Sequence, residues 1–161
     1  MNSGIMASKA FPLHVIAVGL HDRPGAAHSV ADVFSARGLQ MEAFQGTSDS
    51  LSADGHAALL ILFYASLERA SLVTRVLKRL SSVRCAELLA ADDPRLVQSV
   101  LIATTDTTPP DIKIVALDQQ TALATGSPSS MQAWLTSDNA PRRLGGVRLD
   151  VLATQGLGPT Q

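Results

Sequence analysis

The sequence is poor in three features that would place it in a familiar class. It has a single cysteine, Cys85, so no disulfide can form within the chain, and we expect a reducing compartment. Its formal net charge is −1, whereas dedicated nucleic-acid-binding domains usually present a basic face. Its longest apolar run, residues 57–65, is far shorter than the roughly 20 residues of a membrane-spanning helix. These shortages predict a cytoplasmic protein without nucleic-acid or membrane partners.

The chain also lacks the residue patterns of common catalytic and metal sites. Its four histidines have no cysteine or acidic residue at a spacing that matches a known set of metal ligands. We find no paired nucleophile and base and no phosphate-binding loop, and Cys85 is interpreted as a structural thiol. Residues 1–12 lack the apolar stretch of a signal peptide and are interpreted as a flexible tail. We therefore expect no cofactor, no metal and no enzymatic activity.

The most informative stretch, residues 13–38, predicts a strand followed by a helix. Residues 13–20 form an apolar run typical of a strand, and apolar residues then recur at helical spacing over residues 24–37. Gly38 is expected to end the helix, because glycine readily adopts the left-handed conformation found there. With 46% apolar residues, the chain can bury the core of one ordinary domain or two small ones.

The turn between this strand and this helix is the predicted functional site. Asp22 can cap the helix, and Pro24 suits its first turn because proline lacks an N–H that would be unpaired there. Gly25 leaves the free N–H groups of that turn open to a close approach. Bare amides at a helix N-terminus attract a carboxylate or a phosphate. The pattern therefore predicts that a small anionic group binds at this turn.

The next residues predict two strands, a helix and a strand. The helix is expected over residues 67–81, with Ser66 as its N-cap. The strands are expected at residues 39–47, 56–65 and 82–89, with a turn at residues 48–55. The element order is therefore βαββαβ, the ferredoxin-like pattern. It should give a four-stranded antiparallel sheet with two helices on one face.

The second half of the chain predicts a smaller α/β domain over residues 96–155. A helix is expected over residues 127–135, because Ser127 can cap it and Pro128 suits its first turn. The strands are expected at residues 96–103, 111–117, 121–125 and 148–153. The pattern looks like the first one with its first helix replaced by a proline-rich linker, and residues 156–161 are interpreted as a tail.

Residues 13–90 resemble an ACT domain, a small-molecule regulatory module with the βαββαβ fold. The resemblance is carried by the first strand, the turn Asp22-Arg23-Pro24-Gly25, the helix ending in Arg37-Gly38 and the strand after it. Among ACT proteins, the chain is most similar to the small regulatory subunits of acetohydroxy acid synthase (acetolactate synthase). The resemblance implies an α+β protein, with a ferredoxin-like βαββαβ ACT domain over residues 13–91 followed by a smaller, truncated α/β domain.

This resemblance implies a non-catalytic, allosteric regulatory protein of branched-chain amino acid biosynthesis. Such a protein binds a small amino-acid effector, such as valine, leucine or isoleucine, at the interface of an ACT homodimer. It then controls a separate catalytic enzyme subunit. The implied site combines the strand–helix turn of one copy with the second strand of the other. The residues implied to bind the effector are Leu20, Asp22, Arg23, Gly25, Ala26, Ala27, Gln40 and Met41.

Two other interpretations compete with this one. The family typically has asparagine at the positions of Asp22 and Gln40. These departures favour an ACT-like dimerisation module that has lost its ligand and acts only through protein–protein contacts. An RNA recognition motif shares the βαββαβ order, but it needs basic and aromatic residues on its third strand. Residues 57–63 read AALLILF, without a basic residue, so RNA binding is rejected.

Overall fold

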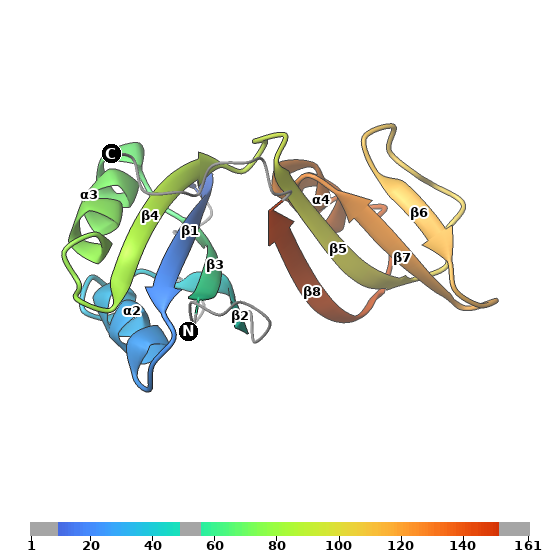
Figure 1. Cartoon of the computed structure of the whole chain (residues 1–161). Coiled ribbons are helices and arrows are strands. Elements are labelled where there is room, and N and C mark those ends of the chain that lie inside the picture. The colour runs from blue at the N-terminus through green and yellow to red at the C-terminus, as the bar shows by residue number, and fades with distance from the viewer. Residues whose placement is uncertain (1–9, 49–55, 152–161) are drawn as a thin grey trace. The chain divides into compact units, whose positions relative to one another are not determined.

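The computed structural model describes residues 10–48 and 56–151 and divides the chain into two compact units, between Ala90 and Ala91. The described residues do not include most of the predicted N-terminal tail or most of the predicted turn after the second strand. They also do not include the end of the predicted last strand or the C-terminal tail. Each unit is a four-stranded antiparallel sheet with helical cover on one face (Figure 1).

Unit 1 has the ferredoxin-like order βαββαβ that the sequence predicts. Its elements are β1 (Leu13–His21), α2 (Ala26–Ser35), β2 (Met41–Ser48), β3 (His56–Tyr64), α3 (Leu67–Leu77) and β4 (Val83–Ala90). The strands lie in the order β2-β3-β1-β4, and all neighbours are antiparallel. Both helices cover the same face of the sheet (Figure 1). The predicted fold class is therefore confirmed for this unit by its topology.

The core of unit 1 lies between the sheet and the two helices. Phe34 of α2 and Phe63 of β3 are fully buried and meet edge to face, with their ring centroids 5.1 Å apart. Val73 and Leu77 of α3 are buried in the same core. Both helices therefore bury apolar side chains against the sheet.

The start of α2 differs from the prediction. The helix begins at Ala26, and Gly25 is its N-cap, with φ at 82° and no side-chain cap hydrogen bond. This left-handed residue turns the chain after Pro24, so helical backbone starts only beyond it. The predictions that Asp22 caps the helix and that Pro24 lies in its first turn are therefore wrong. At the other end, Gly38 has φ at 59°, which confirms the predicted left-handed residue.

α3 is shorter than predicted. Ser66 caps it as expected, and its side chain accepts a hydrogen bond from the amide three residues along the chain, at 3.3 Å. The helix ends at Leu77 rather than at residue 81. Beyond that point the amides of Leu80 and Val83 each donate to the carbonyl three residues earlier, so tight turns replace the helix. Residues 78–82 therefore form a loop between α3 and β4.

Unit 2 repeats the strand order of unit 1. Its elements are β5 (Leu96–Ala103), β6 (Lys113–Ala116), β7 (Thr121–Gly126), α4 (Pro128–Leu135) and β8 (Arg143–Val151). The sheet order β6-β7-β5-β8 matches β2-β3-β1-β4 element by element. No helix lies between β5 and β6, a segment that the structure describes throughout, as the proline-rich linker predicted. Ser127 caps α4 and Pro128 lies in its first turn, also as predicted.

β8 begins earlier than predicted, at Arg143 rather than at residue 148. The first part of this strand was not predicted because it contains Gly145 and Gly146. Glycine is unfavourable in strands and usually marks their ends. The pairing between β5 and β8 shifts register on both sides of Leu101, whose partner is Gly145. Such irregularities are where glycine is tolerated within a sheet.

The β6–β7 turn depends on one carboxylate, which gives a pH-dependent prediction. Asp118 Oδ1 accepts hydrogen bonds from the amides of Gln120 and Thr121, both at 2.7 Å. The bond from Gln120 is the main cause that lowers the pKa of Asp118. Because the pKa is lower in the folded state, this stabilisation is present above the unfolded pKa and is lost as pH falls through the folded one.

The variant Asp118→Ala should therefore lower the free energy of unfolding at neutral pH, and its difference from the wild type should disappear in acid. Urea denaturation at neutral and at acidic pH measures both effects. Asp106→Ala removes an exposed carboxylate from another loop of unit 2 and is the matched control. A difference for Asp118→Ala that stays the same size in acid would contradict the prediction.

Candidate functional site

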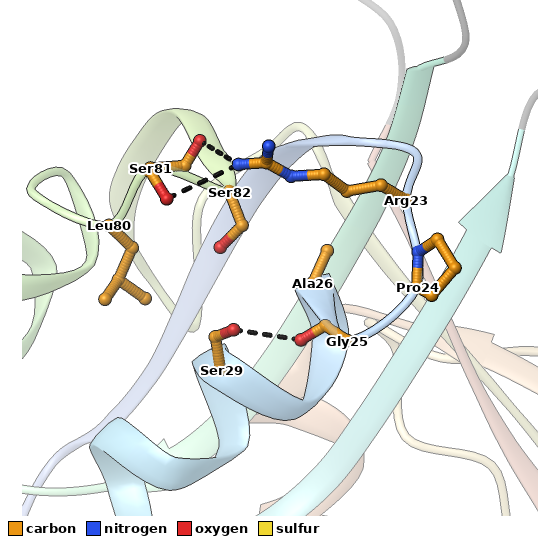
Figure 2. Close-up of a pocket in the computed structure, with 8 residues that line it drawn as sticks. All are labelled: Arg23, Pro24, Gly25, Ala26, Ser29, Leu80, Ser81 and Ser82. Carbon is orange, nitrogen blue, oxygen red and sulfur yellow. Dashed lines mark hydrogen bonds between the residues drawn. The ribbon is translucent and has the colours of Figure 1, made fainter.

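The predicted turn between β1 and α2 borders a cavity of about 280 Å³, and the α3–β4 loop forms its other wall (Figure 2). The cavity is lined by Arg23, Pro24, Gly25, Ala26, Ser29, Leu80, Ser81 and Ser82. The two loops meet because β1 and β4 are antiparallel neighbours, which puts the end of β1 beside the start of β4. The amide of His21 donates to the Ser82 carbonyl at 3.0 Å and joins the two loops at this point.

The first turn of α2, whose residue Ala26 lines the cavity, has unpaired amide groups. Its N-cap, Gly25, has no side chain to accept from them, and the first turn holds no acidic residue. Among the described residues, no acceptor is found for the amides of Ala27 and His28. α3 and α4, by contrast, are each capped by a serine side chain. The exposed end of α2 therefore keeps the partial positive charge that favours an anion.

Arg23 bridges the two loops across the cavity (Figure 2). Its Nη2 donates to the Ser81 carbonyl at 2.5 Å and to Ser81 Oγ at 3.4 Å. Within the described part of the chain, the other guanidinium nitrogens of Arg23 have no acceptor. An arginine has five N–H donors, so this side chain can hold the loop and still donate to a ligand.

Ser82 carries a buried hydroxyl without a partner. The residue is only 6% exposed, and its Oγ has no hydrogen-bond partner among the described residues. Figure 2 shows the hydroxyl pointing from the α3–β4 loop toward α2, on the side where Ala26 and Ser29 lie. The Ser29 hydroxyl is itself used, because it donates to the Gly25 carbonyl at 2.9 Å. An unpaired buried hydroxyl costs about 1–3 kcal/mol, which a hydrogen-bonding ligand would relieve.

The structure brings part of the predicted effector site together. Arg23, Gly25 and Ala26 line the cavity, with Gly25 and Arg23 exposed at its edge. Asp22 and Ala27 are exposed residues of the same turn but do not line the cavity. One cationic side chain, one anionic side chain and a bare helix end therefore lie within a short stretch of the chain.

The other predicted site residues lie away from the cavity. Leu20 is 2% exposed and belongs to the core of unit 1. Gln40 is exposed just before β2, and Met41 is half-buried at its start, where it packs against the core. The sequence interpretation assigned Gln40 and Met41 to a second copy of the chain, so in a single copy they are not expected at the cavity.

Sequence reasoning missed the wall formed by Leu80, Ser81 and Ser82. It assigned Leu80 and Ser81 to the end of a helix and Ser82 to the start of a strand, where none has a functional role. The signal was present in the topology: in a βαββαβ sheet with β1 beside β4, the turn after β1 and the loop before β4 lie at the same end.

The histidines occupy separate positions in unit 1. His14 is buried, and its Nε2 lies 3.1 Å from the Ala65 carbonyl oxygen. On the exposed side of α2, His28 Nε2 lies 3.4 Å from Asp32 Oδ2. Within residues 10–48 and 56–151, no group of three or more His, Cys, Asp or Glu side chains could hold a metal ion. In the same part of the chain, no helix is both long enough and apolar enough to cross a membrane.

Comparisons with known proteins identify similar structures but no sequence family. No family model and no curated protein matches the sequence. The acetolactate synthase small subunit from Thermotoga maritima is similar in structure, with 16% identity over 86% of this chain and 93% of that chain and a TM-score of 0.48. The ligand-free regulatory subunit of aspartate kinase from Thermus thermophilus is similar with 15% identity over 76% of this chain and 87% of that chain and a TM-score of 0.41. At these levels of similarity, the fold assignment rests on the strand order and helices of the chain itself.

Proposed function

We propose that the chain is a non-catalytic regulatory protein that binds a small amino-acid effector at the β1–α2 turn. The observation that carries the proposal is the cavity at the turn that the sequence singled out, with an uncapped helix N-terminus and a guanidinium at its edge. The ferredoxin-like topology of unit 1 and its resemblance to ACT domains support the same function.

An α-amino acid suits this turn by its charges. Its carboxylate can accept hydrogen bonds from the first amides of α2 and from Arg23. Its ammonium can lie beside Asp22, an exposed carboxylate of the same turn. The apolar side chain of valine, leucine or isoleucine would then point away from the turn, toward Met41 of a second copy, while Gln40 of that copy meets the polar atoms.

The second half of the proposed site comes from another copy of the chain. β2 is an edge strand of its sheet, and an edge strand presents backbone groups to which another strand can bind. A ligand held between two copies stabilises the homodimer by its binding energy. If it binds one dimer conformation more tightly, it shifts that equilibrium and can change the activity of a catalytic partner.

The variant Gly25→Asp tests this proposal by isothermal titration calorimetry with valine, leucine and isoleucine. The wild type should bind one of them saturably, and Gly25→Asp should lose at least about 90% of the affinity, because a carboxylate at the N-cap repels the effector carboxylate. A Cβ added at position 25 meets no atom within 4 Å, so the expected cost to folding is the strain of its positive φ.

Gly38→Asp is the matched control. Gly38 also has a positive φ and open space around it, but it lies at the opposite end of α2. It should carry similar backbone strain and bind the amino acid as the wild type does. Equal binding by Gly25→Asp and the wild type would place the effector elsewhere. No binding of any amino acid by a stable dimer would favour the module that acts only through protein–protein contacts.

A further inference from the structure

We propose that Ser82 is a ligand-binding residue: its buried hydroxyl, Arg23 and the first amides of α2 form a subsite for an anionic group within one copy of the chain. The group is a carboxylate or a phosphate. For a carboxylate, the inference rests on the proposed function and adds the α3–β4 loop to the effector site. For a phosphate, it stands without that function.

The hydroxyl of Ser82 is the observation that separates this subsite from an ordinary helix end. Ser82 is only 6% exposed, and its Oγ has no hydrogen-bond partner among the described residues. It points toward α2 across the cavity that it lines (Figure 2). A serine that only filled space here would leave its donor unused at a cost in free energy, whereas a ligand oxygen could accept from it.

Arg23 supplies the charge and closes the subsite. It reaches across the cavity and uses Nη2 to hold Ser81, the neighbour of Ser82, through the Ser81 carbonyl and hydroxyl. The rest of the guanidinium remains able to donate to an oxygen of the ligand. Because Arg23 is exposed, its side chain can swing aside to admit the ligand. Arginine and a helix N-terminus both prefer planar or tetrahedral anions.

Further positive charge surrounds the α3–β4 loop. Lys78 and Arg79 precede the cavity residues of this loop, and Arg84 follows them. All three side chains are exposed, and Arg84 Nε donates to the Leu20 carbonyl at 3.3 Å, which ties it to the end of β1. Against these charges and Arg23, the β1–α2 turn has one carboxylate, Asp22. Among the described residues of these two loops, the excess of positive charge favours an anionic group.

An NMR titration of the full chain tests the subsite with inorganic phosphate, acetate, valine, leucine and isoleucine as probes. The backbone amides of Ala27, His28 and Ser82 should shift saturably with at least one probe. Ser82→Ala should weaken that binding about tenfold or more, because a hydrogen bond to a charged group is lost. Arg23→Gln should weaken it similarly and reduce its dependence on salt.

Two measurements separate a binding role from a structural one. Because the Ser82 hydroxyl is unpaired without ligand, Ser82→Ala should leave the melting temperature of the free protein unchanged or raise it. Ser35→Ala removes an exposed hydroxyl at the far end of α2 and should change neither binding nor melting. A lower melting temperature for Ser82→Ala with unchanged affinity would show a structural serine and overturn the inference.

The remaining outcomes distinguish this inference from the proposed function. Amino-acid binding that Gly25→Asp abolishes and Ser82→Ala leaves intact would keep the proposed function and reject the subsite. Phosphate binding that depends on Ser82, without binding of any amino acid, would keep the subsite and reject the amino-acid effector. No saturable shift with any probe at millimolar concentrations would reject both.

Discussion

Replacing Phe34 by alanine is expected to lower the free energy of unfolding by about 3–5 kcal/mol. The ring of Phe34 is 0% exposed and lies at the centre of the core between α2 and the sheet of unit 1. Its removal leaves a cavity and takes away the edge-to-face contact with Phe63, whose ring plane is inclined at 85°. Because α2 contacts the sheet through few large side chains, the helix has little with which to fill the space.

Urea denaturation followed by far-ultraviolet circular dichroism measures this loss. Phe11→Ala is the matched control, because it removes the same atoms from a side chain that is 45% exposed, and it should cost about 1 kcal/mol or less. A Phe34→Ala variant as stable as Phe11→Ala would mean that α2 is not held to the sheet by this core. The β1–α2 turn would then lack its rigid support.

Trp134→Ala should destabilise unit 2 by a similar amount, about 3–5 kcal/mol. Trp134 is a residue of α4 and is 6% exposed. It lies in the same core as Met131, Ile102 and Val100. α4 is the helix on the covered face of this sheet, and its indole is one of the three buried side chains of the helix. No second helix in the described part of unit 2 can compensate for its loss.

The only tryptophan of the chain also provides the measurement. In the wild type, its fluorescence reports when the core of unit 2 becomes exposed to solvent, and circular dichroism follows the same transition in Trp134→Ala. Leu117→Ala is the control, since Leu117 belongs to unit 2 but is 57% exposed and should cost little. Equal stability of Trp134→Ala and Leu117→Ala would contradict the packing of α4 on its sheet.

Periodicity of apolar residues was sufficient to predict the elements of both units. A period of two or a fully apolar run marks a strand, and a period near 3.6 marks a helix face, so short-range pattern carries this information. The predicted strand over residues 96–103 coincides with β5, and Ser66 and Ser127 cap the helices that they were expected to cap. The sequence also predicted that unit 2 repeats the elements of unit 1 without its first helix, and the two sheets have the same strand order.

Local backbone geometry was harder to predict, because glycine permits alternatives that the sequence does not rank. At the start of α2, an aspartate, a proline and a glycine all fit a helix end, and only the left-handed conformation of Gly25 decides where the helix begins. In the sequence, Gly145 and Gly146 resemble a break between elements. In the structure they lie within β8, where its pairing with β5 is irregular.

The sequence by itself determined the order of the elements and the turn at which a ligand is expected, because both depend on residues close together in the chain. Only the tertiary structure brought Ser81 and Ser82 to that turn. Ser81, the nearer of the two in sequence, lies 56 residues after Gly25. The tertiary structure did so because β1 and β4 pair as antiparallel neighbours, and such pairing joins residues that no local pattern connects. The unpaired hydroxyl of Ser82 is likewise a property of packing, since a serine in a sequence does not show whether its donor finds a partner.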